Sequence, residues 1–354
     1  MKEYWSPRIR NSTPYVPGEQ PRTGKYIKLN TNENPYPPSP RVLEALRGAV
    51  GESLRLYPDP ECWQLRQAIA ERNGITPEEV FVGNGSDEVL AFSFQAFFDP
   101  AKPIRFPDVT YTFYAIFADF FGLRHELVTL DKEFRLSVED LFHSPGGVVL
   151  ANPNAPTGWS VSREEVRQVL EHNRDTVVLV DEAYVDFGGE TVLPLIREYD
   201  NLLVVRTLSK SASLAGIRVG YAMGSENLMN ALRCVRDSIN SYTVDRLAQA
   251  GAEAAIRDVQ WMRENTAKLT RTRAWVLERL NQMGFLVYPS ATNFFFVHHD
   301  SIPAKALMEA LRAQGVLVRH FDKPRICDFL RVSIGTDREM EELCRVLETI
   351  LQGV

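Results

Sequence analysis

The feature of the sequence that most constrains the fold is a set of short, uninterrupted apolar runs. Three of them, at 148–151, 177–180 and 202–205, show no alternation with polar residues. A strand with one face in water alternates, whereas a strand covered on both faces is apolar throughout. Stretches of helical character lie between and before these runs, among them 87–98 and 163–173. The pattern predicts an α/β fold, with a three-layer large domain built on a mostly parallel central sheet.

The length of the chain, 354 residues, exceeds what one compact core usually holds. Near residue 254 the alternating pattern ends, and a charged helical stretch through Leu280 leads into shorter strands and helices. This change predicts a smaller α+β domain. We expect an N-terminal arm at 1–38, a large domain at 39–253 and a small C-terminal domain at 254–354.

The first forty residues are rich in proline, glycine and asparagine. Proline removes a backbone donor and fixes φ, so we expect no regular helix or sheet there. The segment is interpreted as an extended arm that packs on the small domain or on a partner subunit. The first helix is expected from Pro40 to Val50, with Ser39 as its N-cap.

Composition excludes several classes of function. The net charge of -6 gives no basic surface for nucleic acid. The start of the chain has no apolar segment of the export type, and charges interrupt the phenylalanine-rich region 92–121, so no membrane contact is expected. Four scattered cysteines without metal-ligand spacing indicate a reducing, cytoplasmic compartment and no metal site.

A glycine-containing turn at 83–88 separates a predicted strand from a predicted helix. Its glycines permit a tight turn, and the backbone N–H groups of Ser86 and Asp87 open the helix toward an anion. An ordinary tight turn explains the segment equally well. The third glycine of a dinucleotide-binding fingerprint is missing, which disfavours a nicotinamide-dependent dehydrogenase.

An acidic and a phenolic residue follow the strand at 177–180, namely Asp181 and Tyr184. Ligands bind at the carboxyl ends of parallel strands. A carboxylate at that position accepts a hydrogen bond from a protonated ring nitrogen, and the tyrosine reaches a neighbouring phenolic oxygen. The alternative is that Asp181 only caps a helix.

Lys210 follows the strand at 202–205 and is surrounded by small and apolar residues. Partial desolvation makes an amine nucleophilic toward an aldehyde. Ser209 and Arg218 provide a hydroxyl and a guanidinium suited to a phosphate dianion. An anion-binding turn, an acid–tyrosine pair and a lysine beside phosphate ligands together indicate pyridoxal phosphate.

With these residues in place, the chain resembles the fold-type I, class II aminotransferases. The superfamily motifs are Asp181-Glu182-Ala183-Tyr184 and the stretch 207–218, which contains Lys210 and Arg218. Further motifs at 9–15, 29–35 and 330–336 resemble the subgroup that acts on histidinol phosphate. The matching stretches run from Ile9 to Thr336.

This resemblance implies which residues contact pyridoxal 5'-phosphate and what each of them does. Lys210 carries the cofactor as a Schiff base and acts as general base, while Asp181 pairs with the pyridine nitrogen and Tyr184 with the phenolic oxygen. The other implied cofactor contacts are Ser86, Asp87, Ser209 and Arg218 at the phosphate, the ring of Tyr111 over the cofactor, and Asn154.

One motif departs from the family. Related enzymes usually carry Asn-Asn-Pro-Thr-Gly, whose second asparagine hydrogen-bonds the phenolic oxygen of the cofactor. Ala155 occupies that position here. Either Asn154 or Asn152 provides this hydrogen bond instead, or Tyr184 is the only residue that contacts the phenolic oxygen.

Substrate and assembly are also implied by the resemblance. Tyr15, Asn32, Arg319 and Arg331 would hold the substrate and its anionic group. Tyr57 resembles the tyrosine that crosses to the phosphate site of the partner, which implies a homodimer with shared active sites. The implied reaction transfers the amino group of L-histidinol phosphate to 2-oxoglutarate, giving imidazole-acetol phosphate and L-glutamate, in histidine biosynthesis.

Three other functions are alternatives to this reaction, and the sequence argues against the last of them. An aromatic amino-acid aminotransferase and a decarboxylase of a phosphorylated amino acid use the same scaffold, and the latter also needs an anion clamp. A non-catalytic, cofactor-sensing regulator would carry a basic DNA-binding segment before Ile9, and no such segment precedes it.

Overall fold

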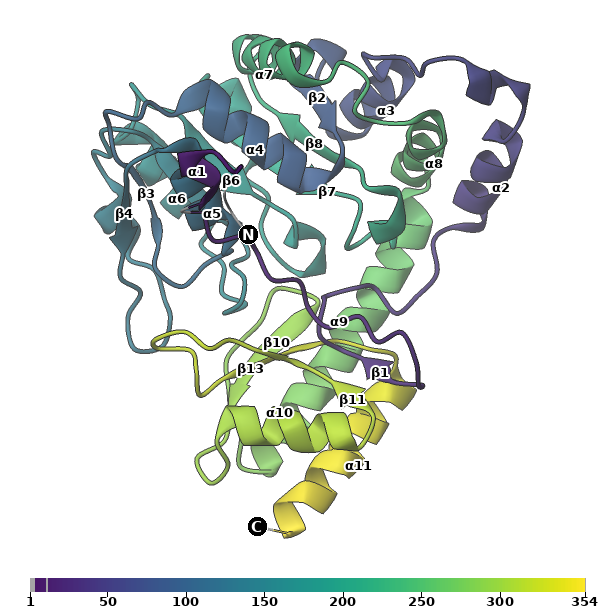
Figure 1. The fold of residues 1–354 in the computed structure, drawn as a ribbon, viewed down its shortest axis with the longest axis vertical. Helices are drawn as coiled ribbons and strands as arrows, with labels where there is room; N and C mark the ends of the chain where they lie inside the picture. Colours follow the sequence, from purple (N-terminus) through teal and green to yellow (C-terminus); the bar gives the residue numbers. More distant parts are fainter. Residues whose placement is uncertain (1–3, 11, 354) are drawn as a thin grey trace.

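The computed structural model describes residues 4–10 and 12–353 of the chain (Figure 1). Asn11, which belongs to the first of the subgroup motifs, lies outside the described residues. A larger part carries one sheet and a smaller part carries another, and the long helix α9 (Val259–Gln282) passes from the first into the second.

The larger sheet has seven strands in the order β2-β8-β7-β6-β5-β3-β4. Their bounds are β2 (Val80–Gly83), β3 (Ile104–Pro107), β4 (His125–Val128), β5 (Val148–Ala151), β6 (Val178–Asp181), β7 (Leu202–Thr207) and β8 (Gly220–Met223). Only β8 runs against the others, because it pairs antiparallel with both β2 and β7. The predicted mostly parallel central sheet is therefore confirmed.

Both faces of this sheet are covered, as the uninterrupted apolar runs predicted. In β5, Val148 and Leu150 point into one core, while Val149 and Ala151 point into the other. Each core needs a layer of helices, which gives three layers. The first core is closed by α2 (Pro40–Ala49), α3 (Trp63–Asn73), α6 (Arg163–Glu171) and α8 (Arg246–Arg257), and the second by α4 (Gly85–Phe97), α5 (Phe113–Phe121) and α7 (Glu226–Ile239).

The smaller sheet is antiparallel, with the order β12-β13-β10-β9. Its strands are β9 (Leu286–Val287), β10 (Phe294–His298), β12 (Arg319–His320) and β13 (Leu330–Ser333). The helices α9, α10 (Ala304–Ala313) and α11 (Asp337–Gln352) close a separate core against it. The predicted smaller α+β part is thus present in the fold.

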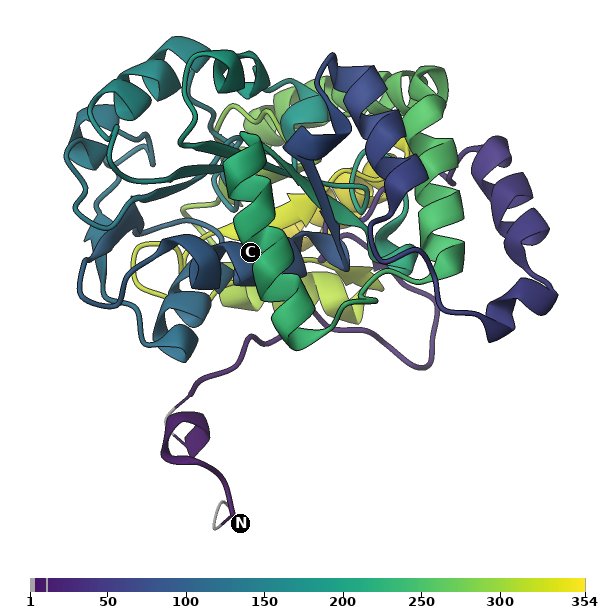
Figure 2. The same cartoon turned by 90° about the horizontal axis from the view of Figure 1, so that it is seen from above.

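The N-terminal segment contradicts the prediction that the first forty residues hold no regular structure. A short helix, α1 (Pro7–Arg10), and a two-residue strand, β1 (Ile27–Lys28), occur there. β1 pairs in parallel with β11 (Val316–Leu317). No proline lies between Pro21 and Pro35, so the backbone N–H groups of this stretch are free to pair. Figure 2 shows the preceding segment, with α1, extending outward from the body.

The charged helical stretch predicted from about Ala254 begins earlier and is broken once. Asp258, with ψ of 61°, separates α8 from α9. Its carboxylate accepts a hydrogen bond from Ser39, whose hydroxyl also caps α2 as predicted. None of the helices in the described part of the chain has both the length and the apolar content needed to cross a bilayer.

Candidate active site

A cavity of about 230 Å³ opens at the carboxyl ends of β5, β6 and β7. The segment that follows β1 and one residue of β13 complete its wall. Eleven of the fourteen residues predicted for the site line this cavity: Tyr15, Asn32, Ser86, Asp87, Tyr111, Asp181, Tyr184, Ser209, Lys210, Arg218 and Arg331. Residues more than 300 positions apart therefore meet in one pocket.

One corner of the cavity has the donors that a phosphate dianion needs. The first N–H groups of α4, which begins at Gly85, have no acceptor inside the helix. Nη1 of Arg218 lies 3.3 Å from the Ser209 hydroxyl, and Nη2 lies 3.4 Å from Asp87. Gly85 has φ of +81°, and a Cβ there would be 2.5 Å from Nη2 of Arg218. The turn therefore needs glycine both for its conformation and for the approach of the guanidinium.

Asp181 ends β6 as a carboxylate with only 5% of its surface exposed. It accepts hydrogen bonds from the hydroxyl of Tyr114, at 2.9 Å, and from the backbone N–H of Ala183, at 3.1 Å. Burial raises its pKa to about 6, and these two bonds oppose that increase. No lysine or arginine within the described residues forms an ion pair with it. A cationic partner from a ligand would relieve its desolvation.

Tyr184 and Lys210 lie close together in the cavity lining. Nζ of Lys210 is 5.7 Å from the centroid of the Tyr184 ring, and it lies 3.3 Å from the carbonyl oxygen of Asn32. The Tyr184 hydroxyl accepts a hydrogen bond from Nδ2 of Asn32, at 2.9 Å. The segment after β1 thus contacts both residues that the family resemblance assigns to the cofactor.

Arg331 is a half-buried cation that lines the cavity. Nη2 donates to the carbonyl oxygen of Asn30, and the rings of Phe294 and Phe321 each lie 5.4 Å from the guanidinium carbon. Nε has no hydrogen-bond partner among the described residues. Burial lowers the pKa of Arg331. A half-buried guanidinium without a carboxylate partner favours the binding of an anion.

These groups fit pyridoxal phosphate. The α4 terminus with Ser209 and Arg218 matches its phosphate, and the unpaired Asp181 matches its ring nitrogen. Lys210 lines the same cavity. Tyr111 lines it as well, and its hydroxyl donates to Asp87 at 2.8 Å.

The structure places Asn154 away from the cavity, although it was predicted to contact the cofactor. Its Nδ2 donates to the carbonyl of Val109 and to the Thr157 hydroxyl, and its Oδ1 accepts from Thr110. Asn154 therefore braces the loop that leads to Tyr111. Asn152 is also occupied, because its side chain forms both of its hydrogen bonds with the backbone of Val161.

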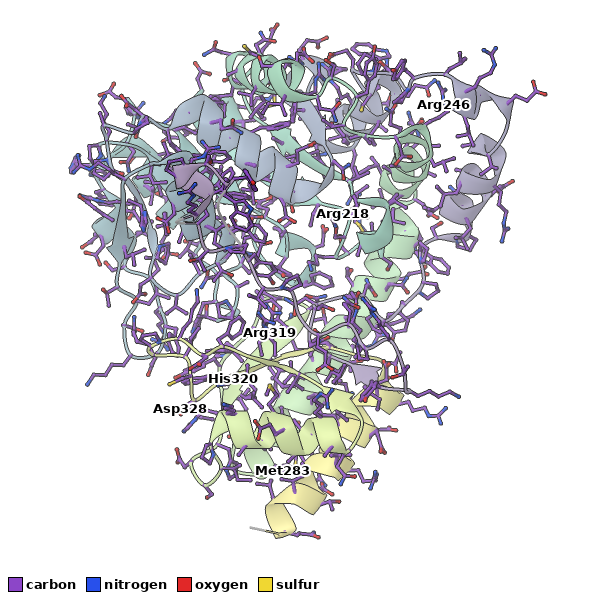
Figure 3. The ribbon with its side chains drawn as sticks, in the orientation of Figure 1. Arg218, Arg246, Met283, Arg319, His320 and Asp328 are labelled. Atoms are coloured by element: carbon purple, nitrogen blue, oxygen red, sulfur yellow. The ribbon has the colours of Figure 1, made fainter. Side chains whose placement is uncertain are left out.

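Arg319 also lies outside the cavity lining, although it was predicted to hold the substrate. Nη2 donates to the carbonyl of Val16 at 3.0 Å, and Nη1 approaches the carbonyl of Pro17 at 3.4 Å. Figure 3 shows Arg319 below, and Arg218 above, the level at which the two parts of the molecule meet. Arg319 thus fastens the arm, and the neighbouring Tyr15 packs on Phe113 with 4.6 Å between ring centroids.

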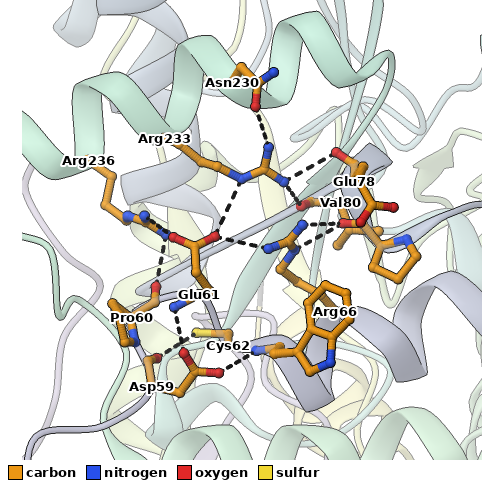
Figure 4. A network of polar contacts seen from close by, with 12 residues as sticks. Asp59, Pro60, Glu61, Cys62, Arg66, Glu78, Val80, Asn230, Arg233 and Arg236 are labelled. Carbon is orange, nitrogen blue, oxygen red and sulfur yellow. Dashed lines mark hydrogen bonds and ion pairs between the residues drawn. The ribbon is translucent and has the colours of Figure 1, made fainter.

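Tyr57 lies at the surface, outside the lining of the cavity of its own chain, with 76% of its surface exposed. Its ring stacks on Tyr242, and its carbonyl accepts from Arg246. The loop that follows is fixed by Glu61, whose carboxylate forms ion pairs with three arginines (Figure 4): Arg66, Arg233 and Arg236. Tyr57 is therefore presented outward on a rigid loop.

Two contributors to the site were missed at the level of sequence. Tyr114 reaches Asp181 from α5, and its position as one of many aromatic residues at 111–121 gave no separate signal. Arg206, on β7, forms a buried ion pair with Glu182, at 2.8 Å, directly behind Asp181. Glu182 belongs to the motif at 181–184. The need of its carboxylate for a cationic partner is the signal in the sequence that could have pointed to Arg206.

The comparisons with known proteins agree with this geometry. Residues 24–347 match the family described as aminotransferase class I and II. The chain is 52% identical to the histidinol-phosphate aminotransferase of Clostridium beijerinckii over 353 residues, which cover 100% of this chain and 99% of that protein. It is 52% identical to the protein of the same name from Clostridium acetobutylicum, with 97% of each chain covered.

A solved structure supports the same fold. The crystal structure of histidinol-phosphate aminotransferase from Sinorhizobium meliloti in complex with pyridoxal-5'-phosphate has a TM-score of 0.90 and 26% identity, and the alignment covers 99% of this chain and 98% of that one.

Proposed function

The chain belongs to the class I and II aminotransferases, and we propose that it transfers the amino group of L-histidinol phosphate to 2-oxoglutarate, giving imidazole-acetol phosphate and L-glutamate. It is a pyridoxal-phosphate-dependent enzyme. The substrate is supported by the two Clostridium proteins of that name, each 52% identical over nearly the full chain. The reaction is a step of histidine biosynthesis.

The observation that carries the choice of substrate is Arg331. Histidinol phosphate has a phosphate and no carboxylate, so its binding requires a cation in the cavity besides the one at the corner suited to the cofactor phosphate. Arg331 is half-buried, lines the cavity and has a buried Nε without a hydrogen-bond partner among the described residues. Tyr15 lines the cavity as well and adds a hydroxyl donor.

Residues of the large part would hold the cofactor. The N–H groups of Ser86 and Asp87, with Ser209 and Arg218, are suited to its phosphate. When bound, pyridoxal phosphate supplies an aldehyde that condenses with amines and a ring that withdraws electrons from the reacting carbon.

Side chains of this protein hold and move the protons of the reaction. The Asp181 carboxylate holds the proton on the ring nitrogen, which suits its buried position and its lack of another cation among the described residues. Nζ of Lys210 takes the proton from the reacting carbon of the substrate. Tyr184 donates its hydroxyl proton to the phenolic oxygen. The ring of Tyr111 lines the cavity and would cover one face of the bound cofactor, which would help to exclude water.

The test is a comparison of half-reaction rates for histidinol phosphate, phenylalanine and threonine phosphate, measured on the purified holoenzyme. We expect kcat/KM for histidinol phosphate to exceed that for phenylalanine by at least about 100-fold, because phenylalanine has no phosphate and each lost charge-assisted hydrogen bond costs roughly tenfold or more. Threonine phosphate keeps the phosphate, and it should be a poorer amino donor than histidinol phosphate. The Lys210→Ala variant should show no turnover with any of them.

A preference for phenylalanine would replace this proposal by an aromatic amino-acid aminotransferase. Release of carbon dioxide from threonine phosphate would replace it by a decarboxylase. A Lys210→Ala variant with full activity would remove the role given to that lysine.

We also propose that the active enzyme is a homodimer with shared sites. The loop of Tyr57 is surrounded by apolar side chains at least 40% exposed: Leu54, Leu56, Trp63, Ile239 and Tyr242. An apolar surface of this kind is typical of a subunit interface. Tyr57 would then reach the phosphate corner of the partner.

The division of the chain into an arm at 1–38, a large domain at 39–253 and a small domain at 254–354 remains our proposal. It is supported by the separate cores under the two sheets. A cytoplasmic location is proposed as well, since the four cysteines are free thiols and the substrate is a biosynthetic intermediate.

A further inference from the structure

The unexplained feature of this cavity is the methyl group of Ala155. It lines the cavity and is 5% exposed, and it has no hydrogen-bonding atom where relatives carry an asparagine side chain. The two nearest asparagines, Asn152 and Asn154, use their side chains on neighbouring loops. Neither takes the place of the missing amide. The phenolic oxygen of the cofactor therefore depends on Tyr184.

The Tyr184 hydroxyl is oriented by a residue that lies 152 positions away. Asn32 donates Nδ2 to its oxygen at 2.9 Å. Asn32 is 1% exposed and has φ of 55°, a left-handed conformation that asparagine tolerates better than most residues. The side chain is thus held in one position by the backbone and by its surroundings.

A second contact decides which end of the Asn32 amide faces Tyr184. The Ser333 hydroxyl oxygen accepts from the backbone N–H of Asn32 at 2.8 Å, so its proton is free to be donated. It donates to Oδ1 of Asn32 at 3.1 Å. Oδ1 is the acceptor in this pair, which leaves Nδ2 to donate to the Tyr184 hydroxyl.

A tyrosine hydroxyl that accepts from an amide has its own proton left for another acceptor. We propose that Asn32 is a positioning residue that turns the Tyr184 proton toward the phenolic oxygen of the cofactor and so does the work of the asparagine missing at Ala155. This inference rests on the proposed placement of the cofactor against Tyr184. It changes the expectation that Asn32 binds the substrate.

Several charged or titratable groups share this cavity and influence the same oxygen. They are Asp181 on β6, Lys210 after β7, Arg331 on β13, Asp87 on α4, Arg218 before β8, Glu33 after β1, and the phenols of Tyr15 and Tyr111. None of them changes in the variants below, so a shift caused by those variants reports on the Asn32–Tyr184 contact.

The experiment follows the visible absorption of the bound cofactor as a function of pH. A donor to the phenolic oxygen stabilises its anionic form and lowers the midpoint of the colour change. Asn32→Gly removes the amide and keeps the left-handed backbone unstrained. Asn32→Asp is isosteric but presents an acceptor, which draws the Tyr184 proton away from the cofactor. We expect the midpoint to rise in both variants, by about one pH unit in Asn32→Asp.

Restoring the common residue provides the decisive comparison. In the double variant Asn32→Gly/Ala155→Asn, a new amide faces the cofactor, and the midpoint should return toward that of the unchanged enzyme. The single variant Ala155→Asn should lower it. Asn30→Ala is the matched control, because that buried amide donates to the carbonyl of Glu19 and not to Tyr184. Its midpoint should not move.

The outcomes distinguish a failure of the inference about Asn32 from a failure of the proposed function. Unchanged midpoints in Asn32→Gly and Asn32→Asp, together with weaker cofactor binding, would show that Asn32 only holds its segment, and would overturn the inference. A rise that Ala155→Asn does not reverse would overturn the claim of compensation. If the unchanged protein binds no pyridoxal phosphate and shows no visible band, the proposed function itself fails.

Discussion

At the scale of single residues, the site depends on charges that are wholly or partly buried before any ligand arrives. Asp181 is buried and Arg331 is half-buried, and neither has an ion-pair partner of its own within the described chain. Such groups destabilise the empty protein, and a ligand of the opposite charge removes that cost. The cofactor and the substrate are thus expected to stabilise the fold strongly.

The first prediction concerns the pH dependence of the cofactor-free protein. Burial raises the pKa of Asp181 from 3.8 to about 6, so between these values the folded state keeps a proton that the unfolded state has lost. The free energy of unfolding should therefore fall as the pH rises from 4 to 6, by about 3 kcal/mol for this group. The Asp181→Asn variant lacks the titrating carboxyl group and should not show this contribution to the pH dependence. Urea unfolding at several pH values should show the difference between the two proteins changing across this window, and parallel curves would contradict the prediction.

The second prediction concerns Tyr114, whose hydroxyl lowers the pKa of Asp181. In Tyr114→Phe that pKa should rise further, which extends the upper limit of the same pH window by about one unit, while its lower limit, set by the unfolded chain, stays in place. Less of the carboxylate is then ionised near neutrality, and the dissociation constant of pyridoxal phosphate should increase about three- to tenfold.

A matched control exists for this substitution. Tyr199→Phe removes another tyrosine–carboxylate bond, from the buried Tyr199 to the exposed Glu171 at 3.1 Å, and neither residue lines the cavity. It should cost stability without changing cofactor affinity. Equal losses of affinity in both variants would show that the effect of Tyr114 is general loss of packing.

At the scale of elements, strand ends and one helix terminus place the reactive groups. β5, β6 and β7 all end at the cavity, and α4 begins there. The packing at the start of α4 is close, since a Cβ on Gly220 of β8 would lie 2.2 Å from the backbone nitrogen of Ser86. The phosphate corner is therefore fixed by backbone contacts, with little freedom to adapt.

The third prediction tests this corner through Gly85→Ala. The new methyl group meets Arg218 and strains a backbone with positive φ, so the guanidinium must move. We expect at least about a tenfold weaker affinity for pyridoxal phosphate, measured by equilibrium dialysis. Gly74→Ala is the control, because that glycine also has positive φ, of +66°, but nothing within 4 Å. It should lose stability alone.

Much of this arrangement was predictable from short-range patterns. Buried strands were evident from their apolar runs, and Asp181, Tyr184 and Lys210 follow such runs directly. β8 was missed because Gly220-Tyr221-Ala222-Met223 has no branched residue and follows an irregular loop. Contacts that depend on the tertiary fold could not be predicted from the sequence either. Asn154 and Arg319 carry the expected residue types, but only the packed structure shows that they face a neighbouring loop and the arm.

At the scale of the whole molecule, two parts and the arm share one cavity. The large part supplies Lys210 and Asp181, the small part supplies Arg331, and the segment after β1 lies between them. If the homodimer proposal holds, Tyr57 of a second subunit adds a further group. Activity then depends on the complete assembly.

The fourth prediction mixes two defective subunits, Tyr57→Ala and Lys210→Ala. Each homodimer should be weakly active or inactive. A mixed dimer has one site in which the intact Lys210 meets an intact Tyr57, so an equal mixture refolded together should recover roughly a quarter of full activity. Activity no higher than the average of the two parents would contradict shared sites. Sedimentation of the unchanged enzyme provides the oligomeric state.

The pairing of β1 with β11 also bears on the order in which the molecule is made. Ile27 pairs with Val316, and the backbone N–H of Asn32 bonds to Ser333 across 301 positions. During synthesis on the ribosome, the early segment has to wait for these late partners, since nearly the whole chain must emerge first. The pocket is therefore completed at the end of translation, and a nascent chain that lacks its last strand holds no finished site for cofactor or substrate.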